Sequence, residues 1–227
     1  MRNKKLKRGF TLLELLIVIG IIAILAVILV IVLNPAETLR KARDSQRMSD
    51  LSTLKTALGI YITSTSTPYL AGTDNTACKT GSAGGSYSSG DKIYYSLVST
   101  SAITDMSIDG GAGGVPLASQ VGSVNLTLTD GTGWLPVNFD VLTSGSPISN
   151  LPIDPMNTIA DLNAVASTDL VYRYACNATN LTFEINAQLE SDAYTLTDDR
   201  RKKDGGNNSN FYEVGTNLKI LGTGADF

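Results

Sequence analysis

The sequence predicts an α+β fold in which one long N-terminal helix, half hydrophobic anchor and half amphipathic, packs on a C-terminal antiparallel β-sheet. Three observations predict it. Residues 15–33 form an uncharged apolar run, residues 34–63 carry apolar side chains at helical spacing, and residues 181–189 alternate apolar with polar side chains. Spacings of three and four indicate a helix, whereas strict alternation indicates a strand. A helix with one apolar face buries that face against a sheet.

The apolar run reads LLIVIGIIAILAVILVIVL, which is 19 residues without a charge, a proline or an amide. At a rise of about 1.5 Å per residue the run spans ~28 Å, close to the thickness of a bilayer's hydrocarbon core. A buried core helix is disfavoured because every side of this helix is apolar. A cleaved secretory signal is a second alternative, but its apolar region is roughly 7–15 residues long and ends at a small-x-small site. We therefore expect a transmembrane helix over residues 10–33.

Basic residues flank this run on both sides. Those before it are Arg2, Lys4, Lys5, Lys7 and Arg8, without any acid, and those after it are Arg40, Lys41, Arg43 and Arg47. A cationic head before an apolar run is a targeting signature. The leader is shorter and its charges lie nearer the span, so the positive-inside rule favours a cytoplasmic N-terminus. We expect a single-pass protein of the cytoplasmic membrane with its C-terminal domain outside.

The segment 34–64 is predicted to be an amphipathic helix. Asn34-Pro35-Ala36-Glu37 has the layout of a helix start, and apolar side chains then recur at Leu51, Leu54, Leu58, Tyr61 and Ile62. Because Pro35 has no N–H for the carbonyl of Ile31, we expect one helical rod with a kink or short break near Asn34. Arg40, Arg43 and Arg47 share another face. They are expected either to touch phospholipid headgroups or acidic neighbours, or to form local pairs such as one with Asp44.

Beyond residue 65 the pattern indicates a β-rich domain. Residues 181–189 alternate as a half-buried strand does, residues 170–176 also favour a strand, and the short linker 177–180 predicts that the two form a hairpin. Further strands are expected at 92–98, 121–129 and 212–220. Glycines and prolines between them are typical of surface loops.

The composition excludes several classes of site. The chain has no histidine, so the commonest general base and metal ligand is missing, and its two cysteines cannot form a four-cysteine zinc site. No phosphate loop or nucleophile motif occurs, so we expect no enzyme and no cofactor. A net charge of −3 gives no reason to expect nucleic acid as a partner. If the C-terminal region is exported, a disulfide between Cys78 and Cys176 is allowed; two separate thiols are the alternative.

The most specific signal is Lys7-Arg8-Gly9-Phe10-Thr11-Leu12-Leu13-Glu14, followed directly by the apolar run. This segment resembles the leader of the type IV pilin and pseudopilin family. The resemblance implies that a prepilin peptidase cleaves between Gly9 and Phe10 and methylates the new amino group of Phe10. Glycine before the cut also suits an extended protease cleft because it has no side chain.

Glu14 is unusual because a carboxylate inside a membrane helix is costly, roughly 2.5–3.5 kcal/mol at the centre and less near an end. Cleavage creates a partner for it, the α-ammonium group of Phe10. In a stack of subunits, Glu14 of one chain is therefore expected to neutralise Phe10 of its neighbour and so to fix the register. The alternative is that Glu14 only extends to the membrane interface.

The resemblance implies a pilus or pilus-like filament whose partners are other copies or related pilins, the prepilin peptidase, the assembly machinery and, before assembly, the membrane. The expected organisation is a cleaved leader at 1–9, a polymerisation helix at 10–33, an amphipathic helix at 34–64 and an extracellular β-rich domain at 65–227. The alternative is a single-span, membrane-anchored surface binding protein that does not polymerise. Less specific similarity to pilin-like proteins lies at 42–47, 131–137, 151–155, 172–174, 189–190, 204–206 and 212–215.

Acidic and amide side chains gather near the C-terminus at Asp198, Asp199, Asp204, Asn207 and Asn208. Some pseudopilins bind calcium in a similar loop, and oxygen ligands on a glycine-bearing turn suit that ion, but the spacing here is not that of an EF-hand. An ordinary polar turn explains the same residues. We therefore expect no metal site, and keep Asp198, Asp199 and Asp204 as weak calcium candidates.

Overall fold

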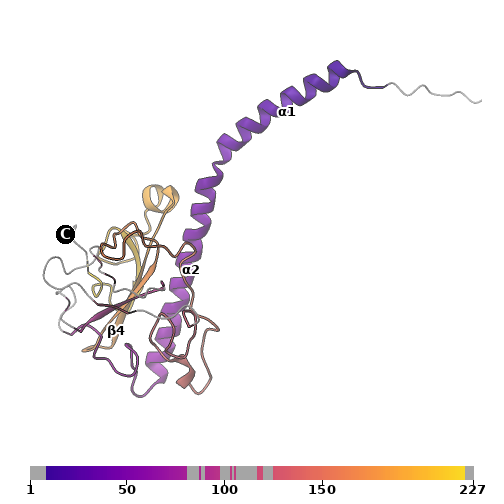
Figure 1. Ribbon diagram of the computed structural model, residues 1–227. Coiled ribbons are helices and arrows are strands. Elements are labelled where there is room, and N and C mark those ends of the chain that lie inside the picture. Colours follow the sequence, from indigo (N-terminus) through magenta and orange to yellow (C-terminus); the bar gives the residue numbers. More distant parts are fainter. Residues whose placement is uncertain are drawn as a thin grey trace, which may run out of the picture. The chain divides into compact units, whose positions relative to one another are not determined.

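The computed structural model describes residues 9–80, 87, 90–97, 103, 105, 117–119 and 125–222. The basic leader before Gly9 and the expected strand residues 121–124 lie outside them. The chain divides into two units, Met1–Arg40 and Lys41–Phe227, each of which is described by itself. Within the described residues the architecture is the predicted α+β one: a long N-terminal helix in two parts and a C-terminal sheet with four antiparallel strands (Figure 1).

The first unit holds helix α1, Leu12–Leu33, which covers the whole apolar run. Thr11 caps its start, and Asn34 ends it in the left-handed conformation with φ 37°. Asparagine tolerates this conformation better than most residues, and the following Pro35 has no N–H to continue the helical hydrogen bonds. The predicted break therefore lies at Asn34.

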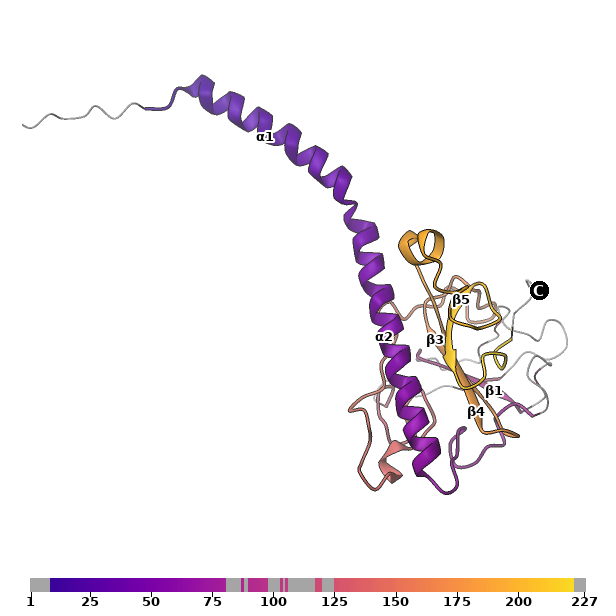
Figure 2. The same cartoon turned by 180° about the vertical axis from the view of Figure 1, so that it is seen from behind.

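Helix α2, Pro35–Ser64, begins directly after this break. Its proline occupies the first turn, where no N–H is needed, and Asn34 Oδ1 accepts from the Glu37 N–H at 3.4 Å. Of the predicted apolar stripe, Ile62 is only partly buried, and the other four residues are buried against one face of the sheet: Leu51, Leu54, Leu58 and Tyr61. Figure 2 shows α2 running alongside β3 and β4. The amphipathic half of the rod thus supplies one layer of the domain.

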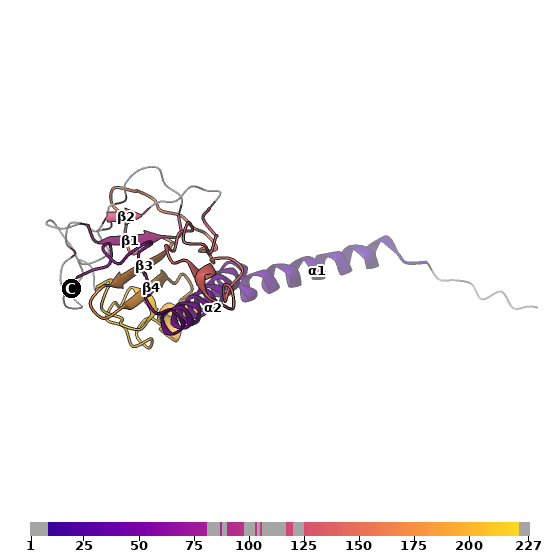
Figure 3. The ribbon, with the colours of Figure 1, turned by 90° about the horizontal axis from the view of Figure 1, so that it is seen from below.

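The sheet has five strands in the order β2-β1-β3-β4-β5 (Figure 3). The strands are β1 Lys92–Tyr95, β2 Leu117–Ser119, β3 Tyr172–Asn177, β4 Thr182–Gln188 and β5 Phe211–Gly215. The predicted hairpin is confirmed: β3 and β4 pair antiparallel from Tyr172↔Ala187 to Asn177↔Thr182. Strand β1 pairs antiparallel with β3, and β5 with β4. The short edge strand β2 is the exception, because it runs parallel to β1.

The prediction of a half-buried strand at 181–189 was wrong in one respect, because both faces of β4 are buried. Its apolar residues Phe183, Ile185 and Ala187 face the core shared with α2. Its polar residues Glu184 and Asn186 are also fully buried. They lie on the opposite face, where a second apolar cluster includes Ile93, Tyr95, Val171, Ala175, Ile220 and Leu221. Alternation therefore identified the strand but not its surroundings.

The expected strand at 121–129 is wrong over its described part, since Asn125–Thr127 form a turn. The backbone of this segment instead supports neighbouring loops: Leu126 O accepts from the Trp134 N–H, and Thr127 O accepts from the Leu151 N–H, at 3.0 and 2.8 Å. These loop-to-loop bonds replace the ladder that a strand would need.

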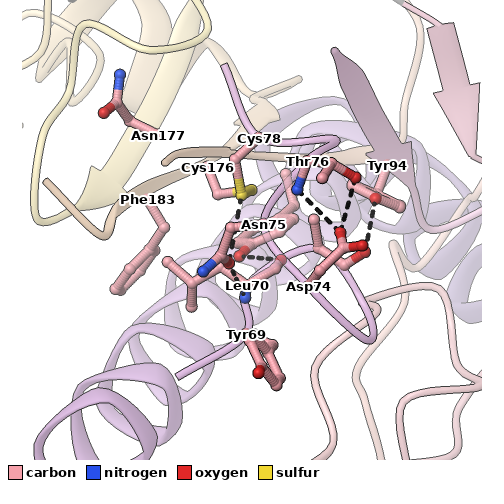
Figure 4. Close-up of a disulfide and its surroundings, with 12 residues drawn as sticks. Tyr69, Leu70, Asp74, Asn75, Thr76, Cys78, Tyr94, Cys176, Asn177 and Phe183 are labelled. Carbon is pink, nitrogen blue, oxygen red and sulfur yellow. Dashed lines mark hydrogen bonds between the residues drawn. A yellow bond between two sulfur atoms is a disulfide. The ribbon is translucent and has the colours of Figure 1, made fainter. Parts of the chain in front are cut away.

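A disulfide joins Cys78 to Cys176 across 98 positions of the chain. It ties the loop before β1 to the end of β3, and both cysteines are fully buried (Figure 4). Two backbone hydrogen bonds join the same two segments beside the disulfide. Lys79 N–H donates to Cys176 O at 2.8 Å, and Ala178 N–H donates to Lys79 O at 3.0 Å. The loop and the hairpin thus form one connected structure.

Candidate processing and assembly site

Gly9 and Phe10, the two residues of the expected cleavage point, are both exposed in the structure. A methyl group added at Gly9 would meet no atom within 4 Å. Phe10 is 88% exposed, which is unusual for so large an apolar side chain. Nothing in the described part of the chain therefore covers the bond between them.

Helix α1 starts with a reciprocal capping box between Thr11 and Glu14. Glu14 N–H donates to Thr11 Oγ1 at 3.2 Å, while Glu14 Oε2 accepts from Thr11 N–H and Thr11 Oγ1 at 2.9 and 2.8 Å. The Thr-x-x-Glu spacing at Thr11–Glu14 is the local sequence signal for such a box. Glu14 thus has hydrogen-bond partners within its own chain.

The side chains of α1 lie outside any core. Every described side chain of the helix is exposed, and 22 residues at about 1.5 Å each give a length of roughly 33 Å. In the described part of the chain one helix, of which α1 is the apolar part, is long and apolar enough to cross a membrane. Such a surface needs either lipid or other apolar side chains around it.

Residues 4–30 match the family model for the prokaryotic N-terminal methylation motif. The chain carries the signal motif of type IV pilins and pseudopilins. The match covers the end of the basic segment, the expected cleavage point, Glu14 and most of α1. Together with the α+β architecture, this motif supports a type IV pilin-like or pseudopilin precursor. Neither the curated proteins nor the solved structures contain a match to the chain.

Helix α2 is fastened to the rest of the second unit by a buried ion cluster around Arg47, which we call the Arg47 cluster. Arg47 Nε and Nη2 donate to the two carboxylate oxygens of Asp154 at 2.6 and 2.9 Å. Its Nη1 donates to Asp44 at 2.8 Å and to Glu190 at 2.6 Å. Arg43 adds a bidentate pair with Glu190 at 2.8 and 2.9 Å. Hydrogen bonds between an arginine and both oxygens of a carboxylate are stronger than those between neutral groups.

The Arg47 cluster favours the ionised forms of Arg47 and Glu190 despite their burial. Burial alone would lower the pKa of Arg47, but the carboxylates of Asp154, Glu190 and Asp44 outweigh it and raise that pKa. Burial opposes ionisation of Glu190 in the same way, and Arg43 and Arg47 nevertheless lower its pKa. Asp44 also accepts from the backbone N–H groups of Glu190 and Ser191. The charges are therefore paired and hydrogen-bonded, as buried charges must be.

The basic face of α2 was expected either to touch headgroups or acidic neighbours or to form local pairs, and the ion pairs distinguish these alternatives for Arg43 and Arg47, while Arg40 is exposed. Arg47 is fully buried and Arg43 is engaged with Glu190, so neither is free to meet phospholipid headgroups. The pairing with Asp44 is part of a larger set. Asp154 and Glu190 come from the pilin-like segments 151–155 and 189–190, whose role the sequence did not reveal because the partners are more than 100 positions apart.

The segments 204–206 and 212–215 meet at a second buried site. Glu213 N–H donates to Asp204 Oδ2 at 2.8 Å, and Glu213 Oε2 accepts from the Asn208 N–H at 2.9 Å. A methyl group at Gly206 would collide with the Glu213 carboxyl group, so a larger residue there would displace that side chain. The Glu213 carboxyl group hydrogen-bonds that of Glu184 on the neighbouring strand.

The carboxylates of the three weak calcium candidates already pair with other groups of the chain. Asp198 pairs with Arg200 and Lys203, Asp199 pairs with Arg201 and Lys202, and Asp204 accepts from backbone N–H groups. Within the described residues, no three acidic, cysteine or histidine side chains gather closely enough to hold a metal ion. The observed contacts are those of a polar turn.

Proposed function

We propose that this chain is a structural subunit of a type IV pilus or a pilus-like filament, assembled through its N-terminal helix. The observation that carries the proposal is the coincidence of the signal motif at residues 4–30 with a helix that is apolar on every side. Before assembly, lipid would cover this helix. In a filament, the same helix of other copies would replace the lipid, held by close packing rather than by the hydrophobic effect.

Processing would precede assembly. A prepilin peptidase would remove residues 1–9 and methylate the amino group of Phe10, and the pilus assembly machinery would then extract the subunit from the membrane. In this organisation residues 10–33 form the membrane and polymerisation helix, residues 34–64 the amphipathic helix, and residues 65–227 the extracellular domain. The exposed Gly9–Phe10 bond supports access by a peptidase.

Glu14 would exchange partners on assembly. In the single chain its carboxylate accepts from Thr11, which lessens the cost of holding an acid at the end of a membrane helix. In a filament it would pair with the methylated ammonium group of Phe10 on an adjoining copy. Removing one member of such a buried pair costs roughly 3–5 kcal/mol, so a misplaced neighbour would be rejected.

Two variants test the proposal. Gly9→Leu should block cleavage and leave a full-length, membrane-bound chain that forms no filaments. Glu14→Gln should still be cleaved but assemble poorly, because glutamine keeps the capping box and removes only the charge. Mass spectrometry of the sheared surface fraction measures both outcomes, with N-methylated Phe10 expected as the first residue of the wild-type protein.

Glu37→Gln is the matched control, since Glu37 occupies the same third position of the next helix. It should assemble as the wild type does. Normal filaments from Gly9→Leu, or a wild-type surface fraction that still begins at Met1, would refute the processing step. Normal filaments from Glu14→Gln would refute the pairing. A cleaved wild-type chain that never leaves the membrane would favour the non-polymerising surface protein instead.

A further inference from the structure

A groove of about 410 Å³ lies in the second unit at the C-terminal end of α2. We call it the α2-end groove. Its walls come from the end of the helix, the loop that follows it and the turn at residues 138–141, with Thr65, Thr67, Tyr69, Thr73, Asn138 and Val141 among the lining residues. Its volume falls within the range of small-molecule sites, about 300–1,000 Å³.

The lining combines exposed apolar surface with uncharged hydrogen-bonding groups. Tyr69 and Val141 are 40% and 58% exposed, and among the described residues the lining contains no acid, lysine or arginine. Within the described residues, the side-chain hydroxyl groups of Thr67, Tyr69 and Thr73 have no hydrogen-bond partner. Asn138 Oδ1 accepts from the Asp140 N–H, which leaves the amide Nδ2 as a donor. The groove therefore offers donors and acceptors beside an aromatic ring.

Both walls are held rigidly by the core. The hydroxyl group of Tyr61, on α2, accepts from the Tyr69 N–H at 3.0 Å and donates to Tyr69 O at 3.2 Å. The ring of Tyr61 also packs edge-on against Phe139 of the opposite wall, with centroids 5.8 Å apart. One buried side chain thus fixes the spacing of the two walls.

The loop that carries Tyr69 is fastened along its length. Leu70 N–H donates to Asn75 Oδ1 at 2.7 Å, and Leu70 O accepts from the Tyr174 hydroxyl at 2.9 Å. The disulfide of Cys78 closes the loop behind it. Figure 4 shows the Tyr69 ring pointing away from this disulfide and its hydrogen bonds. A site fixed in this way loses little conformational entropy when a ligand binds.

We propose that the α2-end groove binds an uncharged carbohydrate. A sugar ring presents an apolar C–H face that stacks on an aromatic side chain, and its rim of hydroxyl groups matches neutral donors and acceptors. The absence of a cation from the lining disfavours anionic ligands, and the absence of an acid disfavours cationic ones. This inference extends beyond filament assembly, since the groove belongs to the second unit alone.

The test uses the full chain, purified in a detergent without a sugar headgroup. Saturation-transfer NMR with lactose, N-acetyllactosamine, maltose, cellobiose and chitobiose identifies the bound sugar, and a titration gives its Kd. We expect at least one sugar to bind with a Kd below about 10 mM. Tyr69→Ala should weaken binding about tenfold and Thr73→Val about threefold, because each removes one contact.

Tyr194→Ala and Thr53→Val are the matched controls, as they remove a ring and a hydroxyl group outside the groove. Both should bind the sugar as the wild type does. Thermal unfolding and an intact disulfide establish that each variant is folded. The proposal is overturned if no sugar in the panel binds, if folded Tyr69→Ala binds as well as the wild type, or if sialyllactose binds in preference to lactose.

Discussion

Glu213 and Glu184 lie on neighbouring strands, on the face of the sheet turned away from α2. Because both carboxyl groups are buried and interact with each other, we expect them to share one proton. Glu184 Oε2 accepts from the backbone N–H groups of Ile220 and Leu221 at 2.7 and 3.0 Å. Burial, followed by the hydrogen bond and charge of Glu184, raises the pKa of Glu213 to about 10. Burial also raises the pKa of Glu184, while Glu213, the two N–H groups and the ammonium group of Lys79 oppose that rise.

Because of this pair, we expect the free energy of unfolding to fall as the pH rises. The folded chain keeps a proton on Glu213 that the unfolded chain releases near the ordinary glutamate pKa, about 4.3. The contribution is therefore complete below that value and is lost as the pH rises toward about 10. Glu213→Gln carries a permanent donor in place of the proton. It should raise the free energy of unfolding at pH 8 by about 1–2 kcal/mol and flatten its pH dependence.

Unfolding monitored by near-ultraviolet circular dichroism from pH 5 to pH 9 measures this effect. Lys79 and Asp204 also face the pair, so the difference between Glu213→Gln and the wild type is more informative than either curve alone. Glu37→Gln should leave the curve unchanged because Glu37 lies outside the second unit. A wild-type curve that rises between pH 5 and pH 9 and is matched by Glu213→Gln would contradict the shared proton.

Individual residues could be predicted from the sequence only where their signal lies within a few neighbouring positions. The motif at residues 4–30 could be predicted because charge, glycine, acid and apolar run follow one another within a few positions, and the roles of Gly9, Phe10 and Glu14 stay predictions. The Thr11–Glu14 capping box has an equally local signal, the Thr-x-x-Glu spacing. Glu184 and Glu213 were not identifiable in this way, because an acid in an alternating strand normally faces water. Here the segment around Ile220 covers it.

At the scale of elements, the Arg47 cluster fixes α2 to the loops that carry Asp154 and Glu190. Arg47→Met should lower the free energy of unfolding by about 3–5 kcal/mol, because it leaves buried carboxylates without their cation. Arg43→Met should cost no more than about 1 kcal/mol, since that pair is partly exposed and Arg47 still holds Glu190. Chemical denaturation of the two variants measures the difference. Equal losses of stability would show that the burial of Arg47 does not make its ion pairs more stabilising than those of the partly exposed Arg43.

The elements themselves were predicted unequally. Both helices, their break at Asn34 and the β3–β4 hairpin follow from periodicity, from proline and from one short turn, all of which act over a few residues. The parallel pairing of β2 with β1 was not predicted, since three residues carry too little pattern. Nor was the second apolar layer, which is assembled from segments as distant as Ile93 and Leu221.

For the whole molecule, the disulfide is the longest covalent constraint. It closes a loop of 98 positions, and a cross-link over about 100 residues stabilises a folded chain by ~2–5 kcal/mol, chiefly by restricting the unfolded one. The double variant Cys78→Ser/Cys176→Ser should lose stability by that amount while keeping the α2-end groove. Thermal unfolding measures the loss. An unchanged midpoint, with the wild-type bond verified by mass spectrometry, would contradict this expectation.

Every residue of the two apolar clusters described here lies at or beyond Leu51. Substitutions along α1 should therefore change which lipids or neighbouring subunits this helix can contact, without lowering the stability of the sheet. Conversely, loops of the second unit can diverge without disturbing the rod. The residues that make up the apolar helix are thereby separate from those that stabilise the sheet.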